Sequence, residues 1–426
     1  MTDTLAFRKS VVRFLGTDRL EGLQAPETDW IRNMRWLDRS GLALPLAARF
    51  EALQPGSAIP SSVRGALRSR LADNQKRMEQ MLQYFQEAVQ ALDASQVQHC
   101  CVKGFSLVPD CFDSIRERHQ IDLDLLIVPQ DTGRAQVALE RLGYRVQRAD
   151  DSGEVRLIRP WKRHLGVHAY LYGLPEPPPI ELHTQVWERD ADDIALPSFS
   201  GFLDASETHE ICGVEFRRLQ PAHHFVYLLL HIFRHLLGSW TRLLSFYEVA
   251  TFIRAHRSEK DIWIKAAQMI EANKVLASAC ALVLELVDST FPVDMPVPLH
   301  QIVRRNLSAE SELWIERYAP AWLLSDPPGN KLALLVQQQF WTDRRAWRQY
   351  LLRRLLPVRK PHKLSEAAAR STRNSVAYRL EDTWYRATRL WYHLRSDCEY
   401  LGARFRWMRM RQRALNLSRE FQLGSK

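Results

Sequence analysis

The sequence of 426 residues lacks any apolar run long enough to cross a membrane. Its longest apolar segments, Phe225–Leu230 and Ala279–Val287, fall short of the ~18 residues that a membrane-spanning helix needs. The first residues also lack the apolar stretch and the small-residue cleavage site of a secretory signal. These absences predict a cytoplasmic protein and leave open a peripheral contact with the inner face of the membrane.

Several short motifs of common protein classes are missing too. The six cysteines form no Cys-x-x-Cys pair, and adjacent Cys100 and Cys101 would project to opposite sides of a strand. Scattered cysteines at this density predict free thiols in a reducing compartment rather than a disulfide framework. The sequence contains no P-loop, Gly-x-Gly-x-x-Gly or Gly-x-Ser-x-Gly motif, so nothing in it supports a P-loop, dinucleotide-binding or α/β-hydrolase fold.

Positive charge is concentrated in the last fifth of the chain. The net charge is +10, but residues 343–426 carry 21 Lys or Arg against 7 Asp or Glu, and the first 342 residues have a net charge of −4. The tryptophans interleaved with these cations are Trp347, Trp384, Trp391 and Trp407. Such a segment can bind an anionic membrane surface or nucleic acid, or it can be the solvated face of packed helices.

The spacing of apolar residues changes along the chain and predicts four regions. Residues 1–95 form a helical N-terminal region, and residues 96–218 form a small α/β domain with a mixed sheet. Residues 219–360 return to helical spacing, and residues 361–426 form a basic helical tail rich in Arg and Trp. The predicted fold class is therefore α+β, with the sheet domain between two helical regions.

Individual elements follow from the same periodicities. Helices are predicted at Val63–Leu92, Gln130–Leu142, Pro221–Leu237, Ser245–Ala255, Asp261–Asn273, Val275–Val287, Glu310–Tyr318 and Lys331–Phe340, with two basic helices within Ser365–Phe421. Strands are predicted at Val97–Val102, Ile121–Val128, Tyr144–Gln147, Val155–Ile158, Gly166–Tyr170 and Ile180–Val186.

Two carboxylates interrupt the predicted apolar strand Ile121–Val128. Side chains alternate along a strand, so Asp122 and Asp124 project from the same face. Neighbouring carboxylates repel each other and resist burial, and a cation relieves this repulsion. Hard oxygen ligands at this spacing suit Mg²⁺, and two such ions can assist an in-line phosphoryl displacement.

Two further positions extend this pattern. Gly104 follows the first predicted strand, where a glycine lets the backbone approach a phosphate closely. Glu181 lies in the later strand Ile180–Val186 and can bring a third carboxylate to the first two. A strand, a Gly turn, an Asp-x-Asp strand and a later acidic strand form the pattern of the nucleotidyltransferase superfamily.

The segment from Cys101 to Pro129 resembles the motif region of the uncharacterised bacterial nucleotidyltransferase family, whose catalytic domain is polymerase-beta-like. The matching positions are Lys103-Gly104, Arg118, Asp122-x-Asp124 and Glu181-x-His183. The resemblance implies that Asp122, Asp124 and Glu181 are catalytic and hold the metal ions. It also implies nucleotide binding by Lys103, Gly104, Ser106 and Arg118. The usual Gly-Ser dipeptide of the superfamily is Gly104-Phe105 here, and Ser106 follows one place later.

Other roles stay open for several of these residues. Lys103 can be a surface cation, and Arg118 can be an ion-pair partner of Asp122. His183 can orient or pack rather than react. His231 and His235 have the i, i+4 spacing that can bind zinc, but no His-Glu-x-x-His motif is present. Structural histidines near the domain junction, or residues lining a catalytic pocket, are the other interpretations.

The resemblance implies a nucleotidyltransferase that uses Mg²⁺, as two ions, to move a nucleotidyl group from an NTP to an unidentified acceptor. A sugar, a lipid-linked intermediate, a peptide or a protein are candidate acceptors. The alternative is a non-catalytic binding protein with the same fold, whose basic C-terminus contacts a membrane or nucleic acid. Intact carboxylates favour the enzyme.

Overall fold

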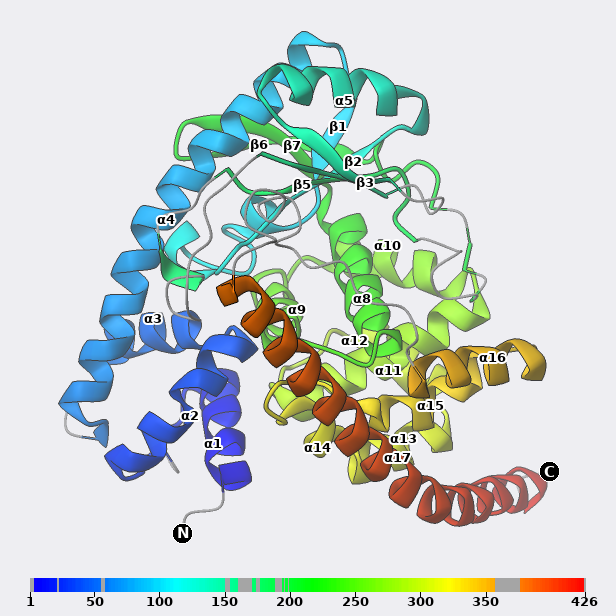
Figure 1. Cartoon of the computed structure of the whole chain (residues 1–426). Coiled ribbons are helices and arrows are strands. Elements are labelled where there is room, and N and C mark those ends of the chain that lie inside the picture. Colours follow the sequence, from blue (N-terminus) through cyan, green and yellow to red (C-terminus); the bar gives the residue numbers. More distant parts are fainter. Residues whose placement is uncertain are drawn as a thin grey trace.

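The computed structural model contains one mixed sheet, with helices that precede and follow it along the chain (Figure 1). The described residues are 4–20, 23–54, 58–149, 154–159, 171–173, 177–187, 194, 196–197, 199–356 and 376–424. The predicted strand Gly166–Tyr170 lies outside the described residues. No helix in these ranges is both long enough and apolar enough to cross a membrane.

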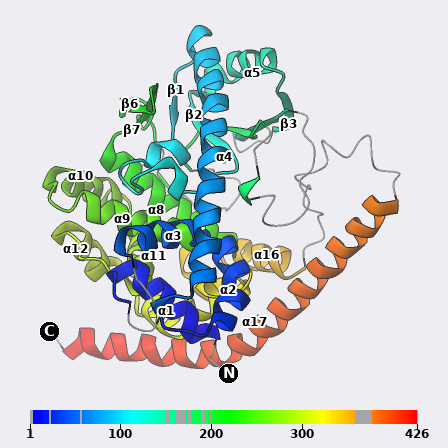
Figure 2. The same cartoon turned by 90° about the vertical axis from the view of Figure 1, so that its left-hand side faces the viewer.

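Four helices precede the sheet. They are α1 (Thr4–Thr17), α2 (Glu27–Ser40), α3 (Ala43–Leu53) and α4 (Ser61–Ala94). The predicted helix Val63–Leu92 is α4, which extends from the N-terminal helices to the sheet (Figures 1 and 2). Its apolar residues recur at helical spacing and are buried, as the sequence predicts. They include Leu67, Leu71, Met78, Met81, Phe85 and Val89.

The sheet has seven strands in the order β3-β4-β5-β2-β1-β7-β6. The strands are β1 (His99–Cys101), β2 (Leu123–Ile127), β3 (Arg145–Ala149), β4 (Glu154–Ile158), β5 (Ile180–His183), β6 (Ser206–Ile211) and β7 (Val214–Leu219). β2 runs antiparallel to β1 and parallel to β5, while β1 runs parallel to β7. The sheet is therefore mixed, and the predicted α+β class is confirmed.

The hairpin of β6 and β7 is not among the predicted strands. Its outward positions carry charged residues such as Glu215 and Arg217, so neither strand forms an apolar run. The two strands are joined at Cys212 and Gly213, which both have positive φ angles. Two positive φ angles suit a tight hairpin turn, but Cys-Gly is not the usual Asn-Gly or Asp-Gly signal of such a turn. The absence of both signals explains the omission.

Two boundaries differ from the prediction near the candidate site. β2 begins at Leu123, so Asp122 lies immediately before the strand rather than within it. β5 ends at His183, although a strand was predicted to Val186. The helix α5 (Thr132–Arg141) follows a 3-10 turn, Pro129–Asp131, and matches the predicted helix Gln130–Leu142 closely.

A larger set of helices follows the sheet. These are α8 (Pro221–Leu237), α9 (Leu243–Ala255), α10 (Lys260–Glu271), α11 (Lys274–Thr290), α12 (Val297–Asn306), α13 (Ala309–Arg317), α14 (Ala319–Leu323), α15 (Leu334–Gln337), α16 (Arg344–Leu355) and α17 (Val376–Gly424). Two predictions need correction. Lys331–Phe340 is the short α15 between two 3-10 turns, and residues 376–424 of the basic tail form one continuous helix. The first part of the predicted helical pair, residues 365–375, lies outside the described residues. The boundaries proposed at residues 95, 218 and 360 stay predictions.

The sheet lies between α5 on one side and α8 and α9 on the other (Figure 1). Aromatic contacts hold these layers together. Phe85 of α4 packs against Phe105 and against Phe216 of β7, with ring centroids 5.1 and 5.0 Å apart. Trp187, just after β5, stacks on Phe233 of α8 at 5.8 Å. Because large aromatic side chains contribute much of the buried area, these contacts fix α8 against the strands that carry the carboxylates.

Candidate active site

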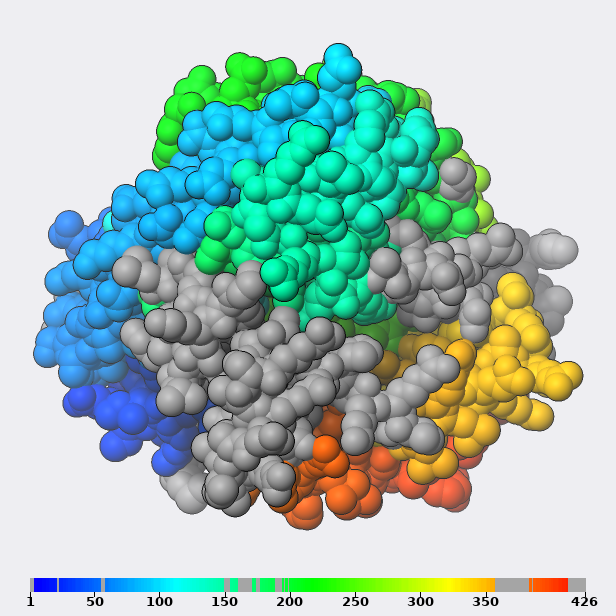
Figure 3. All heavy atoms as spheres, turned by 45° about the horizontal axis from the view of Figure 1, so that its top comes forward, coloured from blue at the N-terminus to red at the C-terminus, as the bar shows by residue number. Residues whose placement is uncertain are grey.

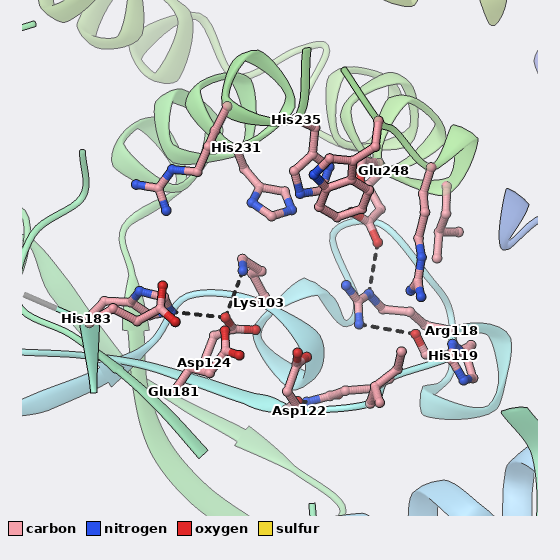
Figure 4. Close-up of a pocket in the computed structure, with 18 of the residues that line it drawn as sticks. Lys103, Arg118, His119, Asp122, Asp124, Glu181, His183, His231, His235 and Glu248 are labelled. Carbon is pink, nitrogen blue, oxygen red and sulfur yellow. Dashed lines mark hydrogen bonds and ion pairs between the residues drawn. The ribbon is translucent and has the colours of Figure 1, made fainter. Parts of the chain in front are cut away.

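A cavity of about 490 Å³ lies between the sheet and α8 (Figure 4). One wall consists of residues from β2, β4 and β5 and from the segment before β2. The opposite wall consists of residues from α8, from the loop after it and from α9. Most of the predicted site residues line this cavity. They are Lys103, Arg118, Asp122, Asp124, Glu181, His183, His231 and His235.

Asp124 is the most firmly held of the carboxylates. Its Oδ1 atom accepts a hydrogen bond from Lys103 Nζ at 2.7 Å and one from His183 Nε2 at 3.1 Å (Figure 4). Burial alone would raise the pKa of Asp124, but Lys103 and then His183 outweigh it and hold the pKa well below its usual range. Asp124 is therefore an anion fixed by two partners.

Glu181 lies directly beside Asp124 because the two residues are paired across β5 and β2. The side chain of Glu181 also forms an ion pair with Arg156 of β4. Burial, followed by repulsion from Asp122 and Asp124, raises the pKa of Glu181 to about 7. Burial and the charge of Asp124 likewise raise the pKa of Asp122. Burial and the proximity of the other carboxylates therefore disfavour the ionised forms of Glu181 and Asp122, whereas Asp124 stays ionised.

This donor set fits a divalent cation. Asp124, Glu181 and His183 each offer one ligand atom, and these atoms all lie within 4.8 Å of one another. Two carboxylates and an imidazole suit a divalent ion. The expected set contained Asp122 in place of His183. Asp122 lines the same cavity, but it is not one of the three residues with clustered ligand atoms.

The two predicted cations have different partners. Lys103 contacts Asp124, and this charge raises the pKa of the lysine although burial alone would lower it. Lys103 is therefore not merely a surface cation. Arg118 pairs with Glu248 of α9 at 2.8 Å rather than with Asp122, which corrects the alternative considered for it. Asn74 of α4 donates a hydrogen bond to the carbonyl oxygen of Arg118 at 3.0 Å and fixes the backbone of this segment.

The structure does not bring Gly104 and Ser106 to the cavity wall. Gly104 has a φ of +68°, and a Cβ at this position would collide with the side chain of Gln120, which lines the cavity and covers the glycine. The Ser106 side chain is wholly buried, with its Oγ atom 3.4 Å from His224 Nε2. The Ser106 hydroxyl is therefore not accessible for the predicted triphosphate contact in this structure.

The histidines of α8 face the carboxylates from across the cavity (Figure 4). The rings of His231 and His235 have centroids 4.1 Å apart. Burial, and then the charge of Lys103, lowers the pKa of both histidines well below the usual value, so both are neutral near pH 7. Over the described ranges, the clustered metal-ligand atoms belong to Asp124, Glu181 and His183, and neither of these two histidines is included.

Sequence reasoning missed the residues that complete the cavity. They are His119, Gln120, Ile121, Glu154, Arg156, Arg234, Trp240, Arg242, Leu244, Ser245 and Glu248. Arg156 lies on a strand with alternating burial, and Glu248 lies in the first half of a mostly apolar helix, where a single buried acid is unusual. That exception was the available signal for Glu248.

Comparison with known proteins gives two findings. Residues 26–290 match the model of a protein family described as "Uncharacterised nucleotidyltransferase". Among solved structures, the solution structure of the antibiotic-resistance factor ANT(2'')-Ia is similar at 12% identity and a TM-score of 0.31, over 45% of this chain and 91% of that chain. No curated protein matches the sequence.

Proposed function

This chain belongs to the uncharacterised nucleotidyltransferase family, and we propose that it is an active enzyme that transfers a nucleotidyl group from an NTP to an acceptor with the help of divalent metal ions. The observation that carries this proposal is the convergence of three carboxylates and Lys103 on one cavity. Asp124 and Glu181 come from paired strands, so the backbone register itself holds them side by side. Closely spaced acids with perturbed pKa values in one cavity are typical of functional sites.

Asp124 and Glu181, with His183 or Asp122, would hold the ions, and Mg²⁺ suits their oxygen ligands. A bound ion of this kind neutralises phosphate charge and stabilises the in-line displacement. The protein keeps Asp124 ionised through Lys103 and His183, so this ligand is ready to bind a cation across the physiological pH range. We therefore assign to Lys103 the positioning of Asp124 in addition to the nucleotide contact implied by the family.

Cations around the cavity would hold the triphosphate. Arg118 is fixed by Glu248, while Arg234 and Arg242 line the opposite wall. Arg suits this task because its planar group bonds two phosphate oxygens at once. Neutral His231 and His235 add no charge to the cavity, and their ring nitrogens can orient an acceptor hydroxyl by hydrogen bonding. The protein thus contributes positioning and charge neutralisation.

The test is transfer from labelled NTPs by the full-length protein, with Mg²⁺ and a bacterial cell extract as the source of acceptors. We expect a labelled product that forms only with metal and that the Asp124→Asn variant does not make. The extract is then fractionated to identify the acceptor class. A folded wild-type protein that neither binds Mg²⁺-NTP nor transfers label would overturn the proposal and favour the non-catalytic binding protein.

We also infer that α17 contacts an anionic membrane surface. Exposed apolar side chains recur along one side of this helix, at Trp384, Trp391, Leu394, Leu401, Phe405 and Met408. Between Thr383 and Gln412 the helix also carries seven arginines and two acids, and both acids are paired, Asp397 with Lys331 and Glu399 with Arg395. Apolar residues flanked by an excess of cations are typical of helices that lie on anionic lipid. The apolar stripe favours lipid over nucleic acid as the partner.

A further inference from the structure

We propose that a basic groove beside the catalytic cavity binds the phosphate group of a phosphorylated acceptor. The groove is a hollow of about 890 Å³ between the loop after α8, the segment 326–331, α16 and α17. Figure 3 shows α16 in yellow beside α17 in orange on one face of the molecule. This inference rests on the proposed function, because it names the class of acceptor for that same site.

The charge of the groove is almost entirely of one sign. Seven of its lining residues are Arg or Lys and one is Asp. The cations are Arg39, Arg242, Lys331, Arg353, Arg354, Arg389 and Arg395. Burial, followed by the charges of Lys331 and Arg389, lowers the pKa of His393 on the same wall, so this histidine is neutral near pH 7. A hollow with this lining attracts anions and repels metal ions.

The groove is built from fixed parts. Lys331 is a buried residue, and its Nζ atom donates a hydrogen bond to Asp397 of α17 at 2.6 Å. Tyr392 Oη donates to the carbonyl oxygen of Gly329 at 3.2 Å, and Arg354 of α16 donates to the carbonyl oxygen of Gly238. These contacts tie α17 to the segment 329–331 and α16 to the residue after α8. The cations therefore converge because the fold holds their helices together, and not through chance proximity of mobile side chains.

The groove and the catalytic cavity share a wall. Trp240 and Arg242 line both hollows. On the cavity side the Trp240 ring packs on His235, with centroids 3.8 Å apart. On the groove side Gly329 lies so close to the Trp240 backbone that a Cβ at this glycine would collide with it. A molecule in the groove therefore contacts residues that also line the cavity with the carboxylates.

The position of the groove identifies its occupant as the acceptor. The triphosphate of the NTP must lie at the carboxylates, where the metal ions would hold it, so the groove is left for the other substrate. Arg-rich walls favour phosphate, which accepts two hydrogen bonds from one guanidinium. The exposed rings of Trp240 and Trp391 add apolar surface for a planar or lipid portion. We therefore expect a phosphorylated small molecule or the phosphate headgroup of a lipid.

Arg389→Glu tests this inference in the full-length protein, with Arg406→Glu as the matched control. Both arginines lie on α17, but Arg389 lines the groove, whereas Arg406 is exposed and does not. The first probe is inorganic phosphate, titrated calorimetrically. We expect Arg389→Glu to weaken phosphate binding about tenfold or more, because it removes one attraction and adds one repulsion, and we expect the control to match the wild type.

A second arm distinguishes free phosphate from a lipid headgroup. Vesicles of phosphatidylcholine with and without phosphatidic acid are compared, using Arg389→Glu and, because Arg406 belongs to the basic side of α17, Arg68→Glu of α4 as the control. Arg68 is exposed and lines neither hollow. A loss specific to Arg389→Glu in either arm supports the groove and identifies the source of the phosphate. The inference would be overturned if Arg389→Glu bound phosphate and transferred the nucleotidyl group as well as Arg406→Glu does. It would also be overturned if the protein bound duplex DNA but neither phosphate nor phosphatidic acid.

Mg²⁺-NTP binding separates this inference from the function on which it rests. Arg389→Glu should bind Mg²⁺-NTP as the wild type does, because Arg389 does not line the catalytic cavity. Unchanged nucleotide binding together with reduced transfer to the extract is the expected pair of results. If the wild type itself binds no Mg²⁺-NTP, the proposed function fails, and the phosphate titration still decides whether the groove binds anions.

Discussion

The cavity with the carboxylates and the basic groove share two lining residues but differ in charge. In the cavity, acidic and basic side chains form ion pairs: Lys103 contacts Asp124, and Arg156 contacts Glu181. In the groove, seven cations face a single acid. A network of both signs fixes each group in position and sets its pKa, which chemistry requires. An excess of positive charge attracts anions, which suits recognition.

The two hollows also differ in their place along the chain. Every residue that lines the cavity lies within residues 26–290, which match the family model. Twelve of the eighteen residues that line the groove lie after residue 290. On the functions proposed here, the chemistry belongs to the family segment and most of the acceptor recognition to the helices that follow it. Variants in the two hollows should therefore separate catalysis from acceptor binding.

The largest effect is expected for Asp124→Asn in the cavity. The amide keeps the shape of the side chain but loses the charge that would bind the metal ions. We expect transfer to fall by about a thousandfold or more, which corresponds to a loss of ~4 kcal/mol of transition-state stabilisation. Phosphate binding in the groove should persist, since Asp124 does not line it. Labelled-NTP transfer and phosphate titration on one preparation measure both.

Asp113→Asn is the matched control for this variant, because Asp113 is exposed and lies outside the cavity. Circular dichroism and a thermal unfolding curve check that both variants fold, since the change at Asp124 would leave Lys103 without its closest anion. A well-folded Asp124→Asn protein with full transfer activity would remove the carboxylates from the mechanism.

A smaller effect is expected in the pH dependence of stability. The folded pKa of Glu181 is about 7, above the ~4.3 of an unfolded glutamate. Between these values the folded state binds more protons at Glu181, so the contribution of Glu181 to the stability of the metal-free protein should fall by about 1–3 kcal/mol as pH rises from about 4.5 to 7. The lowered pKa values of His231 and His235 act in the opposite direction, so this contribution is measured as the difference between the wild type and a variant at Glu181. Added Mg²⁺ should reverse this loss near pH 7, because the cation favours the ionised form.

Glu181→Gln is the control for the pH effect. The amide cannot ionise, so the part of the pH dependence that Glu181 causes should disappear, along with much of the stabilisation by Mg²⁺. Melting temperatures across this pH range, with and without the metal, give the answer. A Glu181→Gln variant whose melting temperature changes with pH as that of the wild type does would contradict the raised pKa of Glu181.

A further effect, on membrane partition rather than on chemistry, is expected from the apolar stripe of α17. Replacing Leu401 and Phe405 with Gln removes two exposed apolar side chains without changing the charge. Binding to vesicles with anionic lipid should weaken about tenfold. This loss is smaller than the full transfer free energy of two such side chains because a helix at the interface buries them only in part. Vesicle flotation measures this partition.

Ile31→Gln controls for a general loss of surface hydrophobicity, because Ile31 of α2 is 65% exposed and does not belong to the stripe. Mg²⁺-NTP binding should be unchanged in all three proteins. Unaltered flotation of the Leu401, Phe405 variant, or wild-type protein that ignores anionic vesicles, would reduce α17 to a solvated basic helix.

The sequence predicted the parts of the site that depend on local order. The apolar spacing of α4 and α8 and the β-rich runs of β2 and β5 placed Asp124, Glu181 and His231 on elements that the structure confirms. Strand alternation explains why Asp124 faces the cavity while Leu123 and Leu125 are buried in the core. The local sequence pattern was enough for these residues because the strand or helix that carries a side chain determines the direction in which it points.

The rest depends on contacts between distant segments. Trp240, Arg242 and Glu248 reach the cavity only because α8 and α9 pack on the sheet, and no periodicity in one segment encodes that meeting. The register of β2 against β5, which places Glu181 beside Asp124, likewise depends on the pairing of segments distant in the sequence. Predicting these features would require knowledge of which elements pair and in what register.

Ser106 gives the smallest expected effect and the sharpest test of the difference between local pattern and packing. The family pattern predicts that its hydroxyl contacts the triphosphate, whereas the structure buries it against His224 and covers Gly104 with Gln120. Ser106→Ala should therefore leave Mg²⁺-NTP affinity within about twofold, while costing ~1 kcal/mol of stability for a lost buried hydrogen bond. Equilibrium nucleotide binding and denaturant unfolding measure the two quantities. A tenfold loss of nucleotide affinity with unchanged stability would show that the Gln120 side chain moves aside when nucleotide binds. The sequence pattern, rather than this packing, would then describe the nucleotide-bound state.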